Sequence, residues 1–167
     1  MTVSIKLILD SSADLTHMDG VDFAYAPLKI CTAERDFTDD DGVDVNEMVA
    51  FLASYKGRSS TSCPNVEDWL AAFGDADRIL CITITGGLSG SYNSALSAKN
   101  IYEGDHPDRR VLVVDSLTAG PEMALMAERV QNLSVDAESL DEIEKGLKSY
   151  KTELLFALES LRNFANN

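Results

Sequence analysis

Residues 83–95, with the sequence TITGGLSGSYNSA, place three glycines and several small hydroxyl side chains between an apolar run and a helix-forming segment. A glycine-rich turn that leads into a helix exposes backbone N–H groups and the positive end of the helix dipole. Ser89 and Ser91 add hydroxyl donors that can turn toward an oxygen. The segment therefore favours a cradle for a carboxylate or a phosphate, with an ordinary helix cap as the plainer interpretation of either serine.

A nucleophilic serine is the alternative chemistry for the same segment. Gly87 and Ser89 match the start of the G-x-S-x-G elbow of hydrolases, but Ser91 occupies the position of its final glycine. A base is also lacking, because His106 follows Ser89 too closely for the usual order of serine, acid and histidine, and the other histidine is His17. A Ser-dependent hydrolase, or a phosphotransfer protein that uses Ser89, is kept as the alternative function.

Nucleotide and metal sites are not predicted. The glycines do not form a nucleotide loop, because the first lysine after them is Lys99 and the G-x-G-x-x-G spacing is absent. The acidic segment 37–48 resembles a calcium loop, yet Phe37 and Met48 stand at the two positions where such a loop needs a carboxylate. We expect neither a metal nor a cofactor.

A second hydroxyl cluster lies upstream, in the segment GRSSTSCPN at residues 57–65. Thr61 and Ser62 stand just before Pro64, and this pattern suits the first turn of a helix. Two helix starts that carry hydroxyls can converge on one anion, whereas a polar loop with a helix cap is the plainer interpretation.

The elements that must position these residues alternate along the chain between apolar runs and helical spacing. The pattern predicts strands at 4–10, 23–31, 78–85, 111–115 and 153–158, and helices at 45–57, 65–74, 91–102, 121–133 and 139–150. Pro27 predicts an edge position or an irregular stretch within the second strand, and Ser139 with Glu142 fits a capping box. We expect one α/β domain over residues 1–167, with a mainly parallel sheet and helices on both faces.

Polar residues follow several of the predicted strands. Asp10 with Ser11, and Asp115 with Ser116, come directly after apolar runs, and the glycine-rich segment follows a third. Ligands of parallel sheets bind outside the carboxyl ends of the strands. We therefore expect these loops to share one rim, although aspartate and serine are also common turn and cap residues.

Bulk composition narrows the class of partner. The 167-residue chain carries a formal net charge of −14, which argues against nucleic acid and against anionic membranes. No apolar run approaches the length of a membrane span, and the start of the chain runs directly into a strand pattern. Cys31, Cys63 and Cys81 show no metal spacing and are expected as free thiols in a cytoplasmic protein.

The chain resembles the DegV family of bacterial fatty-acid-binding proteins, which includes the lipid-carrying subunits of fatty acid kinase. The likeness covers essentially the whole sequence, and TSCPN with GLSGSYNSA is its most specific part. The supporting stretches are LILDSSADL, APLKI, DFTDDDGVD and VLVVDS. The resemblance implies an α/β first domain, a smaller second domain and a lipid between them, so that this chain is expected to be the N-terminal part of a longer two-domain protein.

The resemblance also implies a function. A long-chain fatty acid would be bound through its carboxylate by Thr61, with Ser62 as second choice, and by Ser89, while Ser91 keeps the hydroxyl of a frequent threonine. The protein would be a non-enzymatic carrier for a kinase that phosphorylates the bound fatty acid. Each buried methylene contributes about 0.8 kcal/mol, so the acyl chain would dominate affinity. Candidates for an apolar tunnel, if they are not ordinary core, are Leu28, Ile30, Met123 and Met126.

Overall fold

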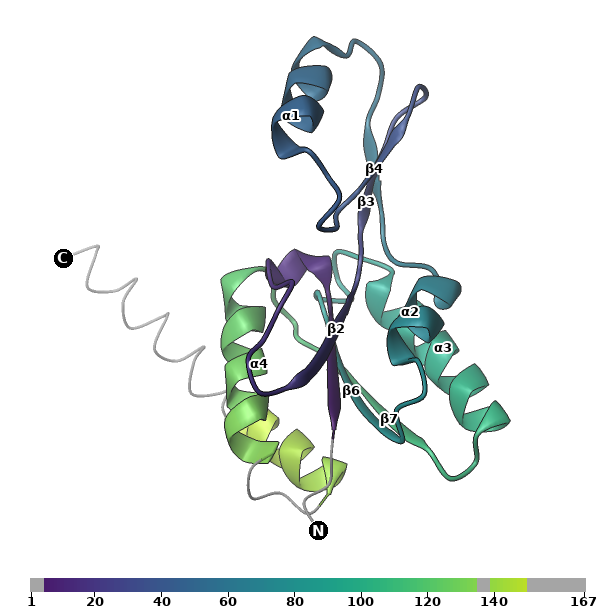
Figure 1. Ribbon diagram of the computed structural model, residues 1–167, viewed down its shortest axis with the longest axis vertical. Helices are drawn as coiled ribbons and strands as arrows, with labels where there is room; N and C mark the ends of the chain where they lie inside the picture. The colour runs from purple at the N-terminus through teal and green to yellow at the C-terminus, as the bar shows by residue number, and fades with distance from the viewer. Residues whose placement is uncertain (1–4, 135–138, 150–167) are drawn as a thin grey trace, which may run out of the picture.

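The computed structural model describes residues 5–134 and 139–149. Its centre is a parallel four-stranded sheet in the order β2-β1-β6-β7. The strands are β1 (Lys6–Asp10), β2 (Asp22–Ala26), β6 (Arg78–Thr83) and β7 (Arg110–Asp115). Helices lie on both faces of this sheet (Figure 1), which confirms the expected α/β class with a mainly parallel sheet.

Alternate residues of the central strands face two separate hydrophobic cores. Leu7 and Leu9 belong to one core and Ile8 to the other, and Leu80 and Cys81 divide in the same way. Because successive side chains of a strand point to opposite faces, a sheet covered on both sides needs apolar residues at consecutive positions. The continuous apolar runs of the sequence therefore follow directly from the two helical layers.

The helices lie close to their predicted positions, and all of them except α1 pack in one of the two cores. They are α1 (Val45–Ser54), α2 (Val66–Phe73), α3 (Ser91–Asp105), α4 (Pro121–Ser134) and a further helix at residues 140–149. Trp69 of α2 and Ala95 of α3 pack in the core of Ile8, whereas Met126 of α4 and Ile143 pack in the core of Leu7. No described helix is both long and apolar enough to cross a bilayer.

The helix at 140–149 begins as the sequence predicted. The Ser139 hydroxyl oxygen accepts a hydrogen bond from the Glu142 backbone N–H at 3.4 Å, as an N-cap does. The strand predicted at 153–158 lies outside the described residues.

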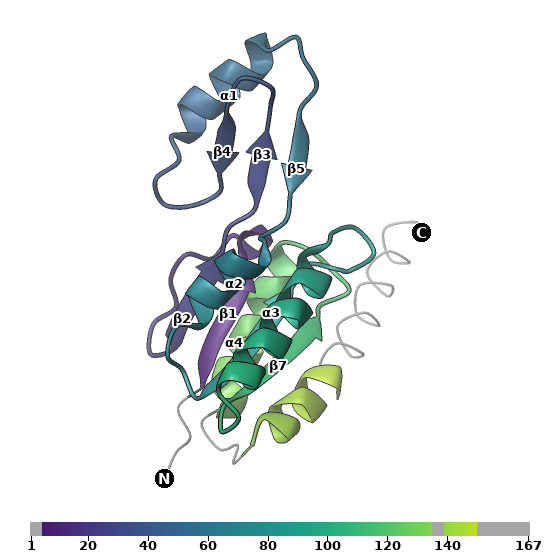
Figure 2. The ribbon, with the colours of Figure 1, turned by 90° about the vertical axis from the view of Figure 1, so that its right-hand side faces the viewer.

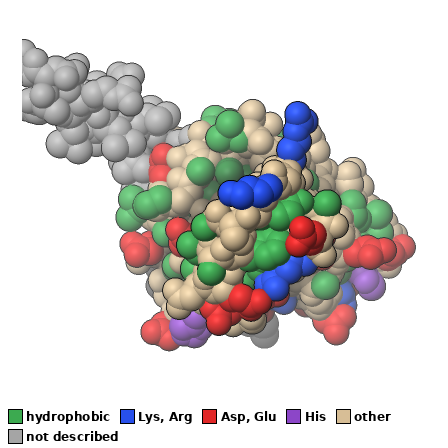
Figure 3. All heavy atoms as spheres, turned by 90° about the horizontal axis from the view of Figure 1, so that it is seen from above, with side chains coloured by type: hydrophobic (Ala, Val, Ile, Leu, Met, Phe, Trp, Pro, Cys, Tyr) green, Lys and Arg blue, Asp and Glu red, His purple; other side chains and the backbone are tan. Residues whose placement is uncertain are grey.

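A small lobe, consisting of residues 29–62, projects from the central sheet (Figures 1 and 2). Three short strands form an antiparallel sheet in the order β4-β3-β5, and α1 completes the lobe. The strands are β3 (Lys29–Cys31), β4 (Asp36–Thr38) and β5 (Ser60–Ser62). Its one buried large side chain is Phe37, whose ring lies 5.4 Å from that of Phe51. Seen from the end of the lobe, hydrophobic side chains are bordered by acidic and basic ones (Figure 3).

Two local expectations were wrong, and both errors concern the small lobe. The segment 23–31 is not one strand: it breaks at Pro27 and Leu28, so that β2 ends as the edge of the parallel sheet and β3 enters the antiparallel one. The hydroxyl cluster is a strand and not a helix start. Asn65 caps α2 by accepting from the Asp68 N–H at 2.9 Å, and this capping box places the start of the helix after Pro64.

Candidate functional site

The carboxyl ends of β1, β6 and β7 meet at one edge of the parallel sheet, as the sequence predicted. β1 ends at Asp10, β6 at Thr83 and β7 at Asp115, and β6 pairs with both of the other strands. The three loops that follow these strands form the rim of the site. The loops after β6 and β7 are hydrogen-bonded to each other, because the Thr85 N–H donates to the Thr118 carbonyl at 2.9 Å.

Asp10 is fully buried under this rim and joins three segments. Its carboxylate accepts hydrogen bonds from the Ser12 hydroxyl at 2.5 Å, the Ile84 N–H at 2.8 Å and the Ser91 hydroxyl at 2.6 Å. Burial raises the pKa of the Asp10 carboxyl above its ordinary value of 3.8, and these donors limit the rise. The carboxylate thereby fixes the end of β1 against the glycine-rich loop and the first residue of α3.

Ser89 and Ser91 have different positions at the start of α3. Ser91 is completely buried, and its hydroxyl donates to Asp10. Ser89 is half-buried, and its hydroxyl oxygen accepts from the Ser91 N–H at 3.2 Å. Within the described part of the chain, the hydroxyl hydrogen of Ser89 has no acceptor. Ser89, which precedes the N-cap residue Gly90, therefore accepts from the first N–H of α3 and keeps one donor available for a ligand.

The aspartate and serine after β7 serve the loops themselves. The Asp115 carboxylate accepts from the Gly86 N–H at 3.2 Å and from the Leu117 N–H at 2.8 Å. Ser116 is buried, and its hydroxyl donates to the Thr118 carbonyl at 3.1 Å. These contacts match the turn-forming interpretation of the second Asp-Ser pair.

Thr61 and Ser62 approach the rim from the small lobe. Thr61 lies opposite Ile30 in the antiparallel sheet, and the Ser62 hydroxyl donates to the Cys63 carbonyl at 3.1 Å. A Cβ atom added at Gly90 would lie 3.2 Å from Cys63 Sγ. The segment after β5 therefore lies against the loop that carries Ser89, so the fold brings the two hydroxyl-bearing segments together.

A pocket of about 280 Å³ lies between the small lobe and the rim. Apolar side chains supply much of its wall, and the hydroxyl-bearing Ser12 and Thr61 stand on it. The remaining lining residues are Leu28, Lys29, Ile30, Phe37, Thr38, Asp39, Val43 and Met48. Leu28 is also tied to the rim, because its N–H donates to the Ser11 hydroxyl at 3.0 Å.

The four tunnel candidates divide between this pocket and the core. Leu28 and Ile30 line the pocket, whereas Met123 and Met126 are fully buried between α4 and the sheet. The residue that sequence reasoning undervalued is Asp10, because the turn interpretation was favoured for each Asp-Ser pair taken alone. Its position at the end of a fully apolar strand was the available signal, since a carboxylate that directly continues a buried strand needs donors around it.

The geometry does not assemble a catalytic serine from the described residues. His106 follows the far end of α3, about 22 Å along the helix axis from Ser91 at 1.5 Å per residue, whereas Ser89 precedes its start. His17 is exposed and lies 2.8 Å from Asp19. Among the described residues, no group of three His, Cys, Asp or Glu side chains is arranged to hold a metal ion.

Comparison with known proteins shows which family has this architecture. Residues 4–167 match the family model described as "Uncharacterised protein, DegV family". A DegV domain-containing protein of Streptococcus pneumoniae is 39% identical over 168 residues, which cover 97% of this chain and 60% of that relative. The chain thus spans about 60% of the length of this curated relative.

Two solved structures share the fold closely. A DegV family protein from Eubacterium eligens, loaded with heptadecanoic acid, superposes with a TM-score of 0.86 at 38% identity, over 89% of this chain and 54% of that one. The Fatty Acid Kinase (Fak) B3 protein of Streptococcus pneumoniae, loaded with linoleic acid, gives 0.85 at 37% identity, over 90% and 55%. From the family match and this shared architecture, the chain belongs to the DegV family.

Proposed function

We propose that this chain forms part of a carrier for a long-chain fatty acid and holds its carboxylate at the rim. The observation that carries the proposal is the position of the apolar pocket beside the rim. Ser12 stands on the pocket wall and also hydrogen-bonds Asp10, the residue that fixes the start of α3. An acyl chain in the pocket would therefore have its head group next to hydroxyls and a helix N-terminus. The fatty acids bound in the two related structures support this assignment.

The head group is assigned to Thr61 and Ser89, with Ser62 as the second choice on β5. No described residue accepts the hydroxyl hydrogen of Ser89, and Thr61 stands on the pocket wall. A contact between Ser91 and the ligand would require its hydroxyl to leave Asp10. We therefore assign Ser91 the role of holding the cradle in place.

Hydrophobic burial and head-group contacts have different roles in this proposal. A helix N-terminus stabilises an anion by about 0.3–1 kcal/mol when exposed and up to about 2 kcal/mol when partly buried, whereas each buried methylene contributes about 0.8 kcal/mol. The acyl chain supplies most of the affinity, and the hydroxyls determine its orientation. The pocket of about 280 Å³ lies at the lower end of the usual range for ligand sites. We therefore assign the rest of the pocket wall to the part of the relatives' sequence that this chain does not span.

The partner is proposed to be a kinase that phosphorylates the bound carboxylate, by analogy with the Fak B3 protein. This role requires no catalytic group from the carrier itself. The cytoplasmic location expected from the sequence remains a prediction.

The test is organic extraction and mass spectrometry of purified protein, carried out on this chain and on a longer version with the full length of its relatives. A fatty acid in stoichiometric amount is expected in the longer protein. Ser89→Ala should raise the dissociation constant for that fatty acid about tenfold or more, because a hydrogen bond to a charged group contributes roughly 1.5–3 kcal/mol. Ser97→Ala, on the exposed surface of the same helix, is the matched control.

Two results would contradict the proposal. One is the absence of lipid from both proteins under conditions in which a known carrier retains its own. The other is equal retention by the Ser89→Ala and Ser97→Ala variants. Labelling of Ser89 by a serine-directed covalent probe would instead favour the hydrolase alternative.

A further inference from the structure

The pocket beside the rim has an end wall inside the small lobe. Ile30 of β3 pairs with Phe37 of β4 on one side and with Thr61 of β5 on the other. Directly opposite residues of an antiparallel pair point to the same face of the sheet, and all three of these residues line the pocket. One row of side chains therefore crosses the sheet from the hydroxyl of Thr61 to the ring of Phe37, over two strand spacings or about 10 Å.

Phe37 closes the pocket at the end of this row. It is 5% exposed, and the ring of Phe51 on α1 lies 5.4 Å from its own ring, centroid to centroid. Phe51 does not itself line the pocket and therefore stands behind Phe37. Tyr55 stacks on Phe51 at 5.4 Å. The space behind the Phe37 ring is thus filled by aromatic side chains, which a smaller residue at position 37 would leave open to the pocket.

Arg35 holds this wall in position. Its guanidinium carbon lies 4.2 Å from the centroid of the Phe37 ring and 5.3 Å from that of Phe51, and a cation over an aromatic face is attracted to it. The guanidinium also donates to Glu47 Oε1 on α1 at 2.8 Å. These contacts restrict the Phe37 ring, so a ligand that reaches it meets a fixed surface.

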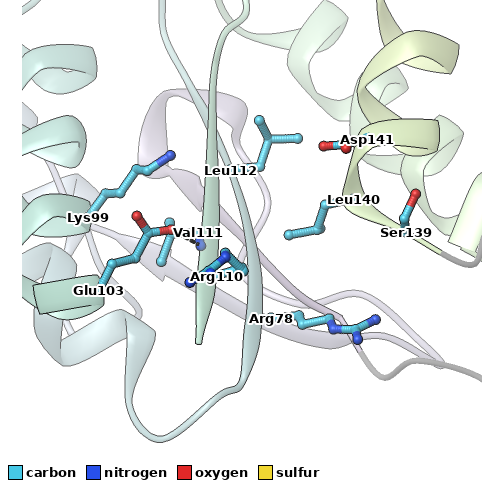
Figure 4. Close-up of a pocket in the computed structure, with 9 residues that line it drawn as sticks. All are labelled: Arg78, Lys99, Glu103, Arg110, Val111, Leu112, Ser139, Leu140 and Asp141. Carbon is cyan, nitrogen blue, oxygen red and sulfur yellow. Dashed lines mark hydrogen bonds between the residues drawn. The ribbon is translucent and has the colours of Figure 1, made fainter. Parts of the chain in front are cut away.

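A larger pocket, of about 380 Å³, is less suited to an acyl chain. It lies where β6 begins at Arg78 and β7 at Arg110, and both arginines line it. Figure 4 shows further charged side chains around it, among them Lys99 and Glu103 of α3. An acyl chain there would take charged groups out of water without giving them hydrogen bonds, which is unfavourable. The acyl chain is therefore assigned to the pocket that ends at Phe37.

We propose that Phe37 limits how many methylenes this pocket buries and thereby selects fatty acids by chain length. The inference rests on the proposed function, because it takes Thr61 as a contact of the carboxylate. A long acyl chain exceeds the row from Thr61 to Phe37 when it is extended, so it must bend within the pocket. Each methylene that is buried strengthens binding about fourfold, whereas one that finds no space adds nothing. Affinity should rise with chain length until the space in front of Phe37 is filled.

The test measures dissociation constants of saturated fatty acids, from myristic to arachidic acid in steps of two methylenes, with the longer protein that has the full length of the relatives. Phe37→Leu opens space toward Phe51 and should shift the tightest binding to a longer acid. Phe37→Trp fills space and should shift it to a shorter one. In each variant, the ratio of the dissociation constants of two neighbouring acids should change about fourfold or more in the stated direction.

Phe23→Leu and Phe23→Trp are the matched controls. Phe23 belongs to β2, packs against the core on the α4 side of the sheet and does not line this pocket. Both control variants should keep the natural order of affinities. Circular dichroism verifies the fold of every variant, and Phe37→Met is the substitute if Phe37→Leu does not fold.

Three results would overturn the inference. If both Phe37 variants bind fatty acids with the natural chain-length preference, Phe37 does not select the chain, and the proposed function is unaffected. If both shift the preference in the same direction, the cause is a general loosening of the lobe. If the natural sequence binds none of the acids, the proposed function fails and this inference fails with it.

Discussion

The Ser91 hydroxyl donates a 2.6 Å hydrogen bond to the carboxylate of Asp10, although 81 positions separate the two residues in the sequence. Both side chains are completely buried, so the contact is shielded from water. Through this contact, the end of β1 positions the start of α3. The loop that carries Ser89 directly precedes α3 and is positioned with it. The proposed ligand site therefore depends on a residue that does not itself face the pocket.

Removing the Asp10 carboxylate should destabilise the protein. Asp10→Ala leaves the Ser12 and Ser91 hydroxyls and the Ile84 N–H without their acceptor. Each donor left unsatisfied costs about 1–3 kcal/mol. The free energy of unfolding, measured by urea titration, should fall by at least that amount. Asp19→Ala, at an exposed position, is the control and should change it by less than about 0.5 kcal/mol; equal effects of the two variants would refute this role.

The buried carboxyl should also make stability depend on pH. Because burial raises the pKa of Asp10 above 3.8 in the folded protein, the folded state binds its proton more readily than the unfolded state does. The stability that this group contributes is fully present below about pH 3.8 and is lost as the pH rises through the raised pKa. Natural protein should therefore gain stability relative to Asp10→Asn as the pH falls from 7 toward 4. Urea titrations of both proteins across this range measure the difference, and a pH-independent difference would contradict the assignment.

Two glycines should respond to alanine in opposite directions. A Cβ atom at Gly86 would lie 3.1 Å from Asp115 Oδ2, in a carboxylate already held by two backbone N–H groups. Gly86→Ala should therefore destabilise the protein by about 1 kcal/mol. Gly104, in α3, has open space around its Cβ position, so Gly104→Ala should stabilise the helix by about 0.5–1 kcal/mol. Thermal unfolding compares the variants, and a shift of both in the same direction would contradict the geometry.

The small lobe should open more readily than the central sheet. α1 has no buried residue, whereas β1 and β6 consist almost entirely of buried ones. Local opening requires little free energy where few apolar contacts are lost. Hydrogen exchange followed by mass spectrometry should show faster exchange for peptides of α1 than for those of β1 and β6. Protection of α1 as strong as that of β1 would contradict this prediction.

The sequence by itself determined the α/β class, the two-sided burial of the central strands and the approximate positions of the helices. These features follow from local patterns, because strand and helix periods differ and caps such as Ser139 act within a few residues. It also indicated the shared rim, since parallel strands joined by helices bring their carboxyl ends to one edge.

Only the tertiary structure decided the small lobe and the direction of the serine hydroxyls. β3, β4 and β5 have three residues each, too short for a periodic pattern, and their pairing joins segments up to about thirty positions apart. Pro27 indicated irregularity but not that the chain changes sheets there. Likewise, Ser89 and Ser91 are equivalent as residue types, and they differ because Asp10 is packed beneath one of them and not the other. Pairing partners and buried acceptors are long-range contacts, which no local pattern of residues encodes.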